Sequence, residues 1–333
     1  MRDSNREWIL ADRPEGEPDL GSFELREGDV PDPDHGELLV RVRYLSVDPY
    51  MRGRMRDAES YAEPWDVGDA MSGGIVGEVV ASESEAYETG DLVTGNGTWA
   101  DYSVLDADSA TGVDPAVADL PAHLGVLGMP GRTAYFGLLD VGEPKPGDTV
   151  VVSGAAGAVG STVGQLAKLN GCEVIGYAGS DEKVDYLENE LGYDVGINYK
   201  EEDVRDALRD ATDGVDVYFD NVGGPITDSV MDHLNVDARV VICGQIAHYN
   251  DTDRPTGPRH FGTLIQKRAS VEGILVRDFA PRFAEATQRL AHWVNAGDLT
   301  YRETITEGIE NAPDAFLGLF EGENIGKQLV KIN

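Results

Sequence analysis

A buried-strand pattern that runs directly into a glycine cluster constrains the fold of this chain more than any other stretch. Thr149–Val152 is a β-branched run with no polar face, and Gly154–Gly160 (GAAGAVG) follows it after one serine. A helical pattern begins directly after this cluster, and Gly171 ends it. Such a turn lets backbone N–H groups and the positive end of the helix dipole face a pyrophosphate. The stretch predicts a dinucleotide-binding corner; the alternative is a plain βα turn that uses glycine for packing.

The predicted elements divide the chain into two domains. Residues 1–123 carry short alternating strands and turns, which is typical of a mainly β, barrel-like domain. In residues 124–298 strands alternate with helices, which indicates a doubly wound parallel sheet. Residues 299–333 return to a strand, a short helix and a strand, and we expect them to rejoin the first domain. The fold class is therefore α/β, a doubly wound parallel sheet plus a mainly β domain.

Several local predictions follow from propensity and turn residues. We expect Gly95-Asn96-Gly97 to interrupt the strands of the first domain and Pro130-Gly131 to form a turn between two helices. Cys172–Ala178, Ala238–Cys243 and Val271–Val276 are predicted strands, and Ala280–Ala296 is a predicted amphipathic helix.

Charge and cysteine content limit the environment and the partners. The chain of 333 residues has 61 acidic and 27 basic residues, a net charge of −34, which repels nucleic acid and anionic membrane surfaces. Because the acids are scattered rather than gathered in a tail, we expect a halophilic protein in a salt-rich milieu. No membrane-length apolar run, signal-peptide pattern or disulfide framework is present, so we expect a cytoplasmic protein.

The end of the second predicted strand indicates which nicotinamide cofactor is used. In dinucleotide folds an acidic residue about 20 positions past the glycines holds the ribose hydroxyls. Here that neighbourhood is Ala178-Gly179-Ser180, and the cation Lys183 follows. A missing acid and an available cation favour a 2′-phosphate, so the sequence predicts NADP(H). The alternative is that Lys183 pairs with its neighbours Asp181 and Glu182.

Motifs spread over the chain resemble one known family. They are Leu45–Met55, Gly128–Tyr135, Ala155–Gly160, Tyr218–Gly224, Cys243–Asn250 and Glu323–Lys327. From about Trp8 to its end the chain resembles the zinc-independent prostaglandin, alkenal and curcumin reductases of the medium-chain dehydrogenase/reductase superfamily. The resemblance implies a GroES-like catalytic domain, a Rossmann domain, NADPH bound in the cleft between them, and a homodimer.

The resemblance also implies which residues contact the cofactor. They are Gly157, Ala158, Val159, Gly160, Lys183, Tyr199, Asn221, Cys243, Gly244, Gln245, Ile246, Tyr249, Ile274, Leu275, Val276 and Asn324. Lys183 and Tyr199 match the family's 2′-phosphate contacts, in agreement with the strand-end argument. The chain departs from many relatives at Val47, and relatives vary at His248, so we expect both positions to affect substrate choice.

The residue inventory argues against zinc and for a conjugated substrate. Cys172 and Cys243 cannot supply a four-cysteine zinc site, and the 6 histidines contain no i,i+4 pair, so we expect no metal. Without a metal to polarise a carbonyl, hydride is best added to the β-carbon of an α,β-unsaturated aldehyde or ketone, which gives an enolate. Tyr249 and Tyr50 are the candidates to donate a hydrogen bond to that enolate or to hold a ribose hydroxyl that does so, and His248 is a further candidate proton donor. The alternatives are an NADPH:quinone reductase and an NADP-binding protein without turnover.

Overall fold

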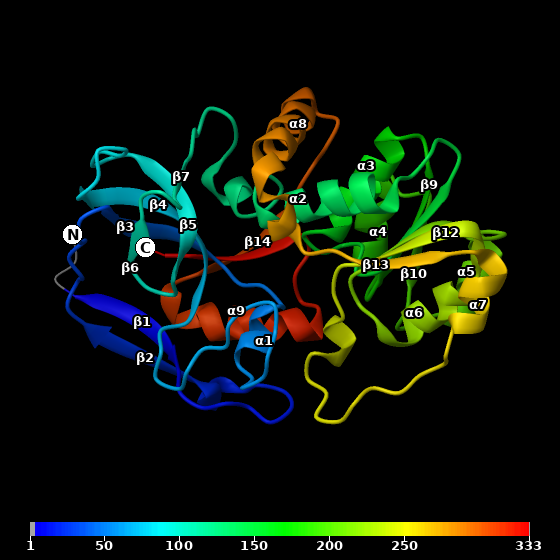
Figure 1. Cartoon of the computed structure of the whole chain (residues 1–333), viewed down its shortest axis with the longest axis horizontal. Helices are drawn as coiled ribbons and strands as arrows, with labels where there is room; N and C mark the ends of the chain where they lie inside the picture. Colours follow the sequence, from blue (N-terminus) through cyan, green and yellow to red (C-terminus); the bar gives the residue numbers. More distant parts are fainter. Residues whose placement is uncertain (1–3, 333) are drawn as a thin grey trace.

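The computed structural model describes residues 4–332, in which six parallel strands form the sheet around the glycine corner (Figure 1). They are β8 (Thr149–Val152), β9 (Glu173–Ala178), β10 (Val195–Asn198), β11 (Val215–Asp220), β12 (Leu234–Ile242) and β13 (Ser270–Gly273). The spatial order β10-β9-β8-β11-β12-β13 is the 3-2-1-4-5-6 order of the dinucleotide-binding fold. Because the order reverses between β8 and β11, a crevice opens at the carboxyl ends of these two strands.

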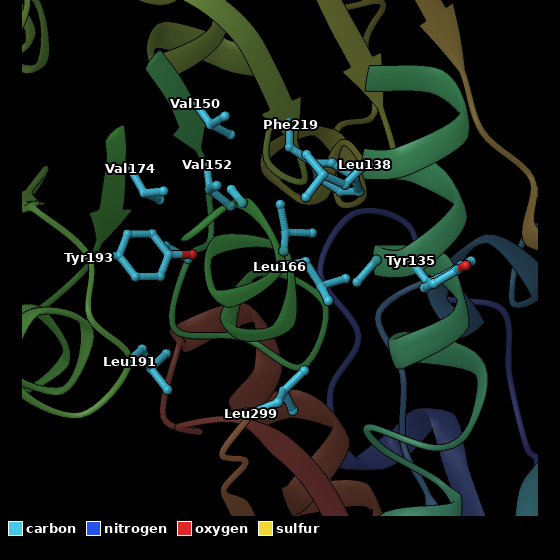
Figure 2. Packing of buried hydrophobic residues seen from close by; sticks show 14 of the residues in the cluster. Tyr135, Leu138, Val150, Val152, Leu166, Val174, Leu191, Tyr193, Phe219 and Leu299 are labelled. Carbon is cyan, nitrogen blue, oxygen red and sulfur yellow. The ribbon is translucent and has the colours of Figure 1, made fainter. Parts of the chain in front are cut away.

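Helices cover both faces of this sheet, and each face has its own apolar core. They are α2 (Met129–Phe136), α3 (Gly160–Leu169), α4 (Asp181–Asn189), α5 (Val204–Ala211), α6 (Gly224–Met231), α7 (Phe261–Lys267) and α8 (Phe283–Ala296). One core joins α2, α3 and α8 to the sheet, and Figure 2 shows Val152 of β8, Leu166 of α3 and Phe219 of β11 within it. The second core joins α5 and α6 to the opposite face. Two buried faces explain why the central strand β8 has no polar side.

The remaining strands form the mainly β part at the left of Figure 1. Its main sheet holds β3 (Glu37–Ser46), β4 (Ser72–Ser82), β5 (Leu92–Thr98), β6 (Tyr102–Asp106), β7 (Thr111–Gly112), β14 (Glu303–Glu307) and β15 (Lys327–Lys331). A hairpin of β1 (Asn5–Leu10) and β2 (Phe23–Gly28), the short α1 (Met51–Arg54) and α9 (Ala312–Glu321) complete it. Because β15 pairs with β3, the C-terminal segment lies in the sheet of the N-terminal segment. The exact boundaries at residues 123 and 298 stay predictions.

Short helical turns connect these elements. They are η1 (Leu20–Ser22), η2 (Leu120–His123), η3 (Gly137–Gly142), η4 (Ile246–His248), η5 (Val276–Arg282) and η6 (Ile309–Asn311). Within residues 4–332 the structure contains no helix long and apolar enough to cross a membrane.

Several local predictions are wrong, and packing explains most of them. Pro130-Gly131 is not a turn but the first turn of α2, where proline lacks only an N–H that has no helical partner. Gly95-Asn96-Gly97 does not interrupt the strands but lies within β5, where a Cβ at Gly97 would collide with Ile75 and Ser103. The strand predicted to reach Val276 ends at Gly273, and α8 begins at Phe283 after η5. Cys172 and Cys243 lie just outside β9 and β12, and both thiols are free.

We expect the thermal midpoint of unfolding to rise with KCl concentration. The compact state holds a net charge of −34, and its repulsion weakens as the Debye length falls from about 30 Å at 0.01 M to about 3 Å at 1 M salt. A rise of about 10 °C between these concentrations is expected in scanning calorimetry. Sucrose at matched osmolality is the control. A midpoint that is constant or falls with KCl would contradict a role for screening.

Candidate active site

The glycine corner lies at the crevice and depends on glycine at two positions. Gly154 has φ +59°, in the left-handed region, directly after Ser153 at the end of β8. At Gly160, the first residue of α3, a Cβ would collide with the carbonyl oxygen of Gly154 and lie 2.7 Å from the Cα of Ala155. The turn and the start of the helix are therefore in close contact, and the positive end of the α3 dipole faces the turn. This geometry fits a phosphate group.

The C-terminal segment before β15 contacts the same corner. The backbone N–H of Gly326 donates to the carbonyl oxygen of Ala156 at 2.7 Å, and Gly326 forms a β-bridge with Gly157. The side-chain amide of Asn324 donates to the Gly326 carbonyl at 2.8 Å. The structure thus brings the predicted cofactor contact Asn324 next to Gly157, although about half of the chain lies between them.

Cations and a phenol gather at the carboxyl ends of β9 and β10. Ser180 caps α4 by accepting the N–H of Lys183, whose ammonium donates to the carbonyl of Gly322 at 2.6 Å. Burial, followed by the charge of Lys200, lowers the pKa of Lys183, so the two ammonium groups lie near one another. The ring of Tyr199 lies close over Gly179. Asp181 instead accepts from Asn198 at 2.7 Å, which contradicts the alternative that it neutralises Lys183. Glu182, the other acid of that alternative, does interact electrostatically with Lys183. Two adjacent cations nevertheless fit a 2′-phosphate.

The loops after β11 and β12 form the other side of the crevice. Asn221 donates to Ser153 through its backbone N–H (2.9 Å to Oγ) and its side-chain amide (2.8 Å to the carbonyl). Cys243 and Gly244 donate to the carbonyl of Asp220 at 2.8 and 3.0 Å. The loop continues through Gln245 and η4 to Tyr249. Predicted contacts Asn221 and Cys243–Tyr249 therefore lie beside the glycine corner, and Ile274 joins them by donating to the carbonyl of Ile242 at 3.0 Å. The next two predicted contacts, Leu275 and Val276, are partly buried.

Tyr249 and Tyr50 come from different domains and are linked through a third tyrosine. The Tyr249 hydroxyl accepts the N–H of Gln245 at 3.4 Å, and burial raises its pKa. Tyr50 precedes α1, and burial, then Asp48, raises its pKa. Tyr61, which the sequence did not single out, interacts electrostatically with both other tyrosines, and burial, then Tyr249, raises its pKa to about 12. Because all three pKa values are raised, the phenols stay protonated donors at neutral pH.

Two arginines of the mainly β domain hold the loop that carries Tyr249. Arg56 donates to the carbonyls of Tyr249 and Asp251, both at 2.7 Å. Arg52 is 1% exposed and donates to the side chain of Asn250 at 3.0 Å. The buried pair Lys327–Asp48, with N···O 3.1 Å, supports the segment before Tyr50. These contacts across the domain boundary hold the loop of Tyr249 beside the helix that follows Tyr50. His248 Nδ1 makes a hydrogen bond with Asp251 Oδ2 at 2.8 Å.

Sequence and structure comparisons identify relatives over the whole chain. Residues 6–113 match the family described as N-terminal domain of oxidoreductase, and residues 158–292 match zinc-binding dehydrogenase. YfmJ of Bacillus subtilis, named as an NADP-dependent oxidoreductase, is 53% identical, with 100% of this chain and 99% of its own covered. NADPH-dependent curcumin reductase of Escherichia coli is 43% identical, and the alignment covers 100% of this chain and 98% of the relative. The structure of CurA from Vibrio vulnificus in complex with NADPH aligns with TM-score 0.93 and 45% identity over 98% and 99%.

A doubly wound sheet with a glycine corner, joined to a mainly β domain that closes over its carboxyl edge, defines a medium-chain dehydrogenase/reductase. Within that superfamily the chain belongs to the branch of prostaglandin, alkenal and curcumin reductases. Although one matching family is named for zinc, no group of three or more His, Cys, Asp or Glu side chains among residues 4–332 is arranged to hold a metal ion. That the enzyme works without zinc stays a prediction.

Proposed function

We propose that this enzyme uses NADPH to reduce the C=C bond of α,β-unsaturated aldehydes and ketones. The observation that carries the proposal is that Tyr50, Tyr61 and Tyr249 interact electrostatically beside the glycine corner, while Lys183 and Lys200 follow the neighbouring strands β9 and β10. The names of the curcumin and alkenal reductases among its relatives support the same class of substrate.

The chain's own residues suit the binding of NADPH. The backbone N–H groups of Gly157–Gly160 would bind the pyrophosphate. Lys183 and Tyr199 would bind the 2′-phosphate, and the loops at Asn221 and Cys243–Tyr249 would bind the nicotinamide half. The collision of a Cβ at Gly160 with Gly154 shows that the corner has no room for a larger residue. When bound, NADPH supplies the hydride.

The protein's part in the reaction is to stabilise the charge that develops on the substrate. As the β-carbon gains a hydride, the π electrons of the double bond move toward the carbonyl oxygen and form an enolate. The Tyr249 hydroxyl, fixed by the N–H of Gln245, donates a hydrogen bond to that oxygen. Tyr50 is the second donor. A proton from solvent water, taken up at the α-carbon, completes the saturated product.

A substrate panel tests this proposal. We expect NADPH oxidation with enals and enones, a much lower kcat/KM with benzoquinones, and a saturated carbonyl product in gas chromatography. Assays run in high salt with NADPH and NADH. Faster turnover of quinones would favour the NADPH:quinone reductase, and binding of NADPH without turnover of any substrate would indicate a non-catalytic protein.

Replacing Lys183 by alanine is expected to weaken NADPH binding by about 30-fold and NADH binding by about twofold or less. The reason is that only NADPH carries the 2′-phosphate that the ammonium would contact. Fluorescence titration measures both dissociation constants. Lys168→Ala is the matched control, because Lys168 pairs with Asp194 at 2.7 Å at the far end of α3. Equal losses for both cofactors would defeat the phosphate assignment.

We expect kcat with saturating enone to stay constant between about pH 7 and 9.5. Burial raises the pKa of Tyr249 above its ordinary value, Cys243 and Asp220 raise it further, and only the Gln245 N–H opposes them. A raised pKa keeps the donor protonated to higher pH, so any alkaline loss falls beyond this window. A loss of kcat with an apparent pKa below about 9 would contradict Tyr249 as the donor.

A homodimer also stays a proposal. β13 lies at the edge of the parallel sheet, and near it Phe261 and Ile265 of α7 are 72% and 79% exposed. An open strand edge beside exposed apolar side chains is a surface that a second copy could cover.

A further inference from the structure

One buried carboxylate contacts all three loops of the proposed cofactor site. Asp220 ends β11, at the crevice, and its side chain is 0% exposed. Its Oδ1 accepts hydrogen bonds from Ser153 Oγ, Tyr218 Oη, Val222 N and Gly223 N at 2.9–3.0 Å. Its Oδ2 accepts from Thr227 Oγ1 at 2.7 Å and Gln245 Nε2 at 3.0 Å.

The donors come from segments that are separate in sequence. Ser153 begins the glycine corner after β8, Val222 and Gly223 follow β11, and Gln245 follows β12. Each segment also carries proposed cofactor contacts: Gly157–Gly160 follow Ser153, Asn221 precedes Val222, and Gln245 is itself one of them. The Ser153 hydroxyl also accepts the N–H of Asn221, and the N–H of Gln245 donates to the Tyr249 hydroxyl at 3.4 Å. Asp220 therefore touches no proposed substrate atom but fixes groups that do.

The energetics of burial indicate that this arrangement is specific. Within residues 4–332 no ion pair neutralises Asp220, so the anion is supported by neutral donors. A buried carboxylate is costly unless its lone pairs are filled, which forces the donors to converge. Gly223 has φ +79°, and a Cβ there would collide with the Gln245 side chain, so the two loops are packed together at this point.

We propose that Asp220 is a positioning residue that holds the loops after β8, β11 and β12 in one arrangement before the cofactor binds. Through Gln245 it also sets the place of the Tyr249 hydroxyl. The inference rests on the proposed location of the cofactor site, and it concerns the hydrogen bonds of Asp220 rather than its charge.

Two substitutions at Asp220 separate hydrogen bonding from charge. Asp220→Asn keeps the four contacts of Oδ1, and the Thr227 hydroxyl can rotate to accept from an NH₂ at the Oδ2 position, so only the contact with Gln245 is lost, because that amide also donates to the Gly244 carbonyl at 2.9 Å. Asp220→Leu removes every acceptor. Asp216→Leu is the matched control. Asp216 lies at the other end of β11, and its carboxylate accepts hydrogen bonds from Thr149 N at 2.9 Å and Asn235 Nδ2 at 2.8 Å.

NADPH titration and hydrogen exchange of the cofactor-free protein are the measurements. For Asp220→Leu we expect NADPH affinity to fall by about 30-fold and the amides of residues 221–223 and 243–249 to exchange faster. Asp220→Asn should stay within about threefold of wild type, and Asp216→Leu should lower the unfolding midpoint but leave NADPH affinity within about twofold. If Asp220→Leu does not fold, Ser153→Ala should still weaken NADPH about fivefold.

Three results would overturn the inference. They are wild-type affinity and exchange in Asp220→Leu, an equal loss of affinity in Asp216→Leu, and a loss in Asp220→Asn as large as in Asp220→Leu, which would assign the effect to charge. Because hydrogen exchange is measured without cofactor or substrate, a wild-type protein that fails to reduce enones would disprove the proposed function without deciding the role of Asp220.

Discussion

Replacing Tyr249 by phenylalanine is expected to lower kcat for an enone by about 10- to 100-fold. The change removes the hydroxyl that accepts the Gln245 N–H and would donate to the enolate oxygen, and it leaves the buried ring in place. A hydrogen bond that is stronger in the transition state than in the ground state affects kcat rather than KM. Steady-state kinetics with NADPH at saturation measure the effect.

Tyr87→Phe is the control for this substitution. Tyr87 also donates a hydrogen bond from a partly buried phenol, to the carbonyl of Ala110 at 3.0 Å, but it lies within the mainly β domain. Its loss should leave kcat unchanged. If Tyr249→Phe also keeps the wild-type kcat, Tyr249 has no part in the chemistry, and Tyr50 or Tyr61 becomes the donor to test.

Replacing Gly160 by alanine is expected to weaken NADPH binding by about 100-fold. The added methyl group would collide with the carbonyl oxygen of Gly154 and the backbone of Ala155, so the turn must move away from α3. Movement of the turn displaces the N–H groups that would face the pyrophosphate. Fluorescence titration measures the affinity, and calorimetry separates this effect from unfolding.

Gly262→Ala is the matched control, because Gly262 is also a glycine in a helix but a Cβ there would meet no atom within 4 Å. Alanine has the higher helix propensity, so Gly262→Ala should bind NADPH as wild type and be slightly more stable. Unchanged NADPH affinity in Gly160→Ala would mean that the cofactor does not use this corner.

The parallel sheet was predictable because short strands that are apolar at its centre alternate with helices. The prediction of Thr149–Val152 matches β8 residue for residue. The errors arose where distant packing decides the structure. Nothing near Gly97 indicates that Ile75 and Ser103 exclude a Cβ there, so a glycine in a strand was taken for a turn. The proline of Pro130-Gly131 favours a turn and a helix start equally well.

The candidate site was predictable where the residues lie in motifs and not elsewhere. Tyr61 belongs to an irregular loop without periodicity, and only its electrostatic interactions with Tyr50 and Tyr249 identify it. Arg52 lies in the motif Leu45–Met55 and Arg56 directly after it, but nothing in the sequence indicates that both bind the loop of Tyr249 across the domain boundary. Asp220 did carry a signal: an acid at the end of an apolar strand, on the carboxyl edge of a parallel sheet, faces the ligand crevice.

The central claim is hydride transfer to the β-carbon of a conjugated carbonyl, and deuterium labelling tests it most directly. The enzyme is incubated with an enone and NADPH that carries deuterium at the reactive C4 position of the nicotinamide, and the product is analysed by NMR. We expect a saturated ketone with the deuterium on the β-carbon. An allylic alcohol with the deuterium on the former carbonyl carbon would contradict the claim.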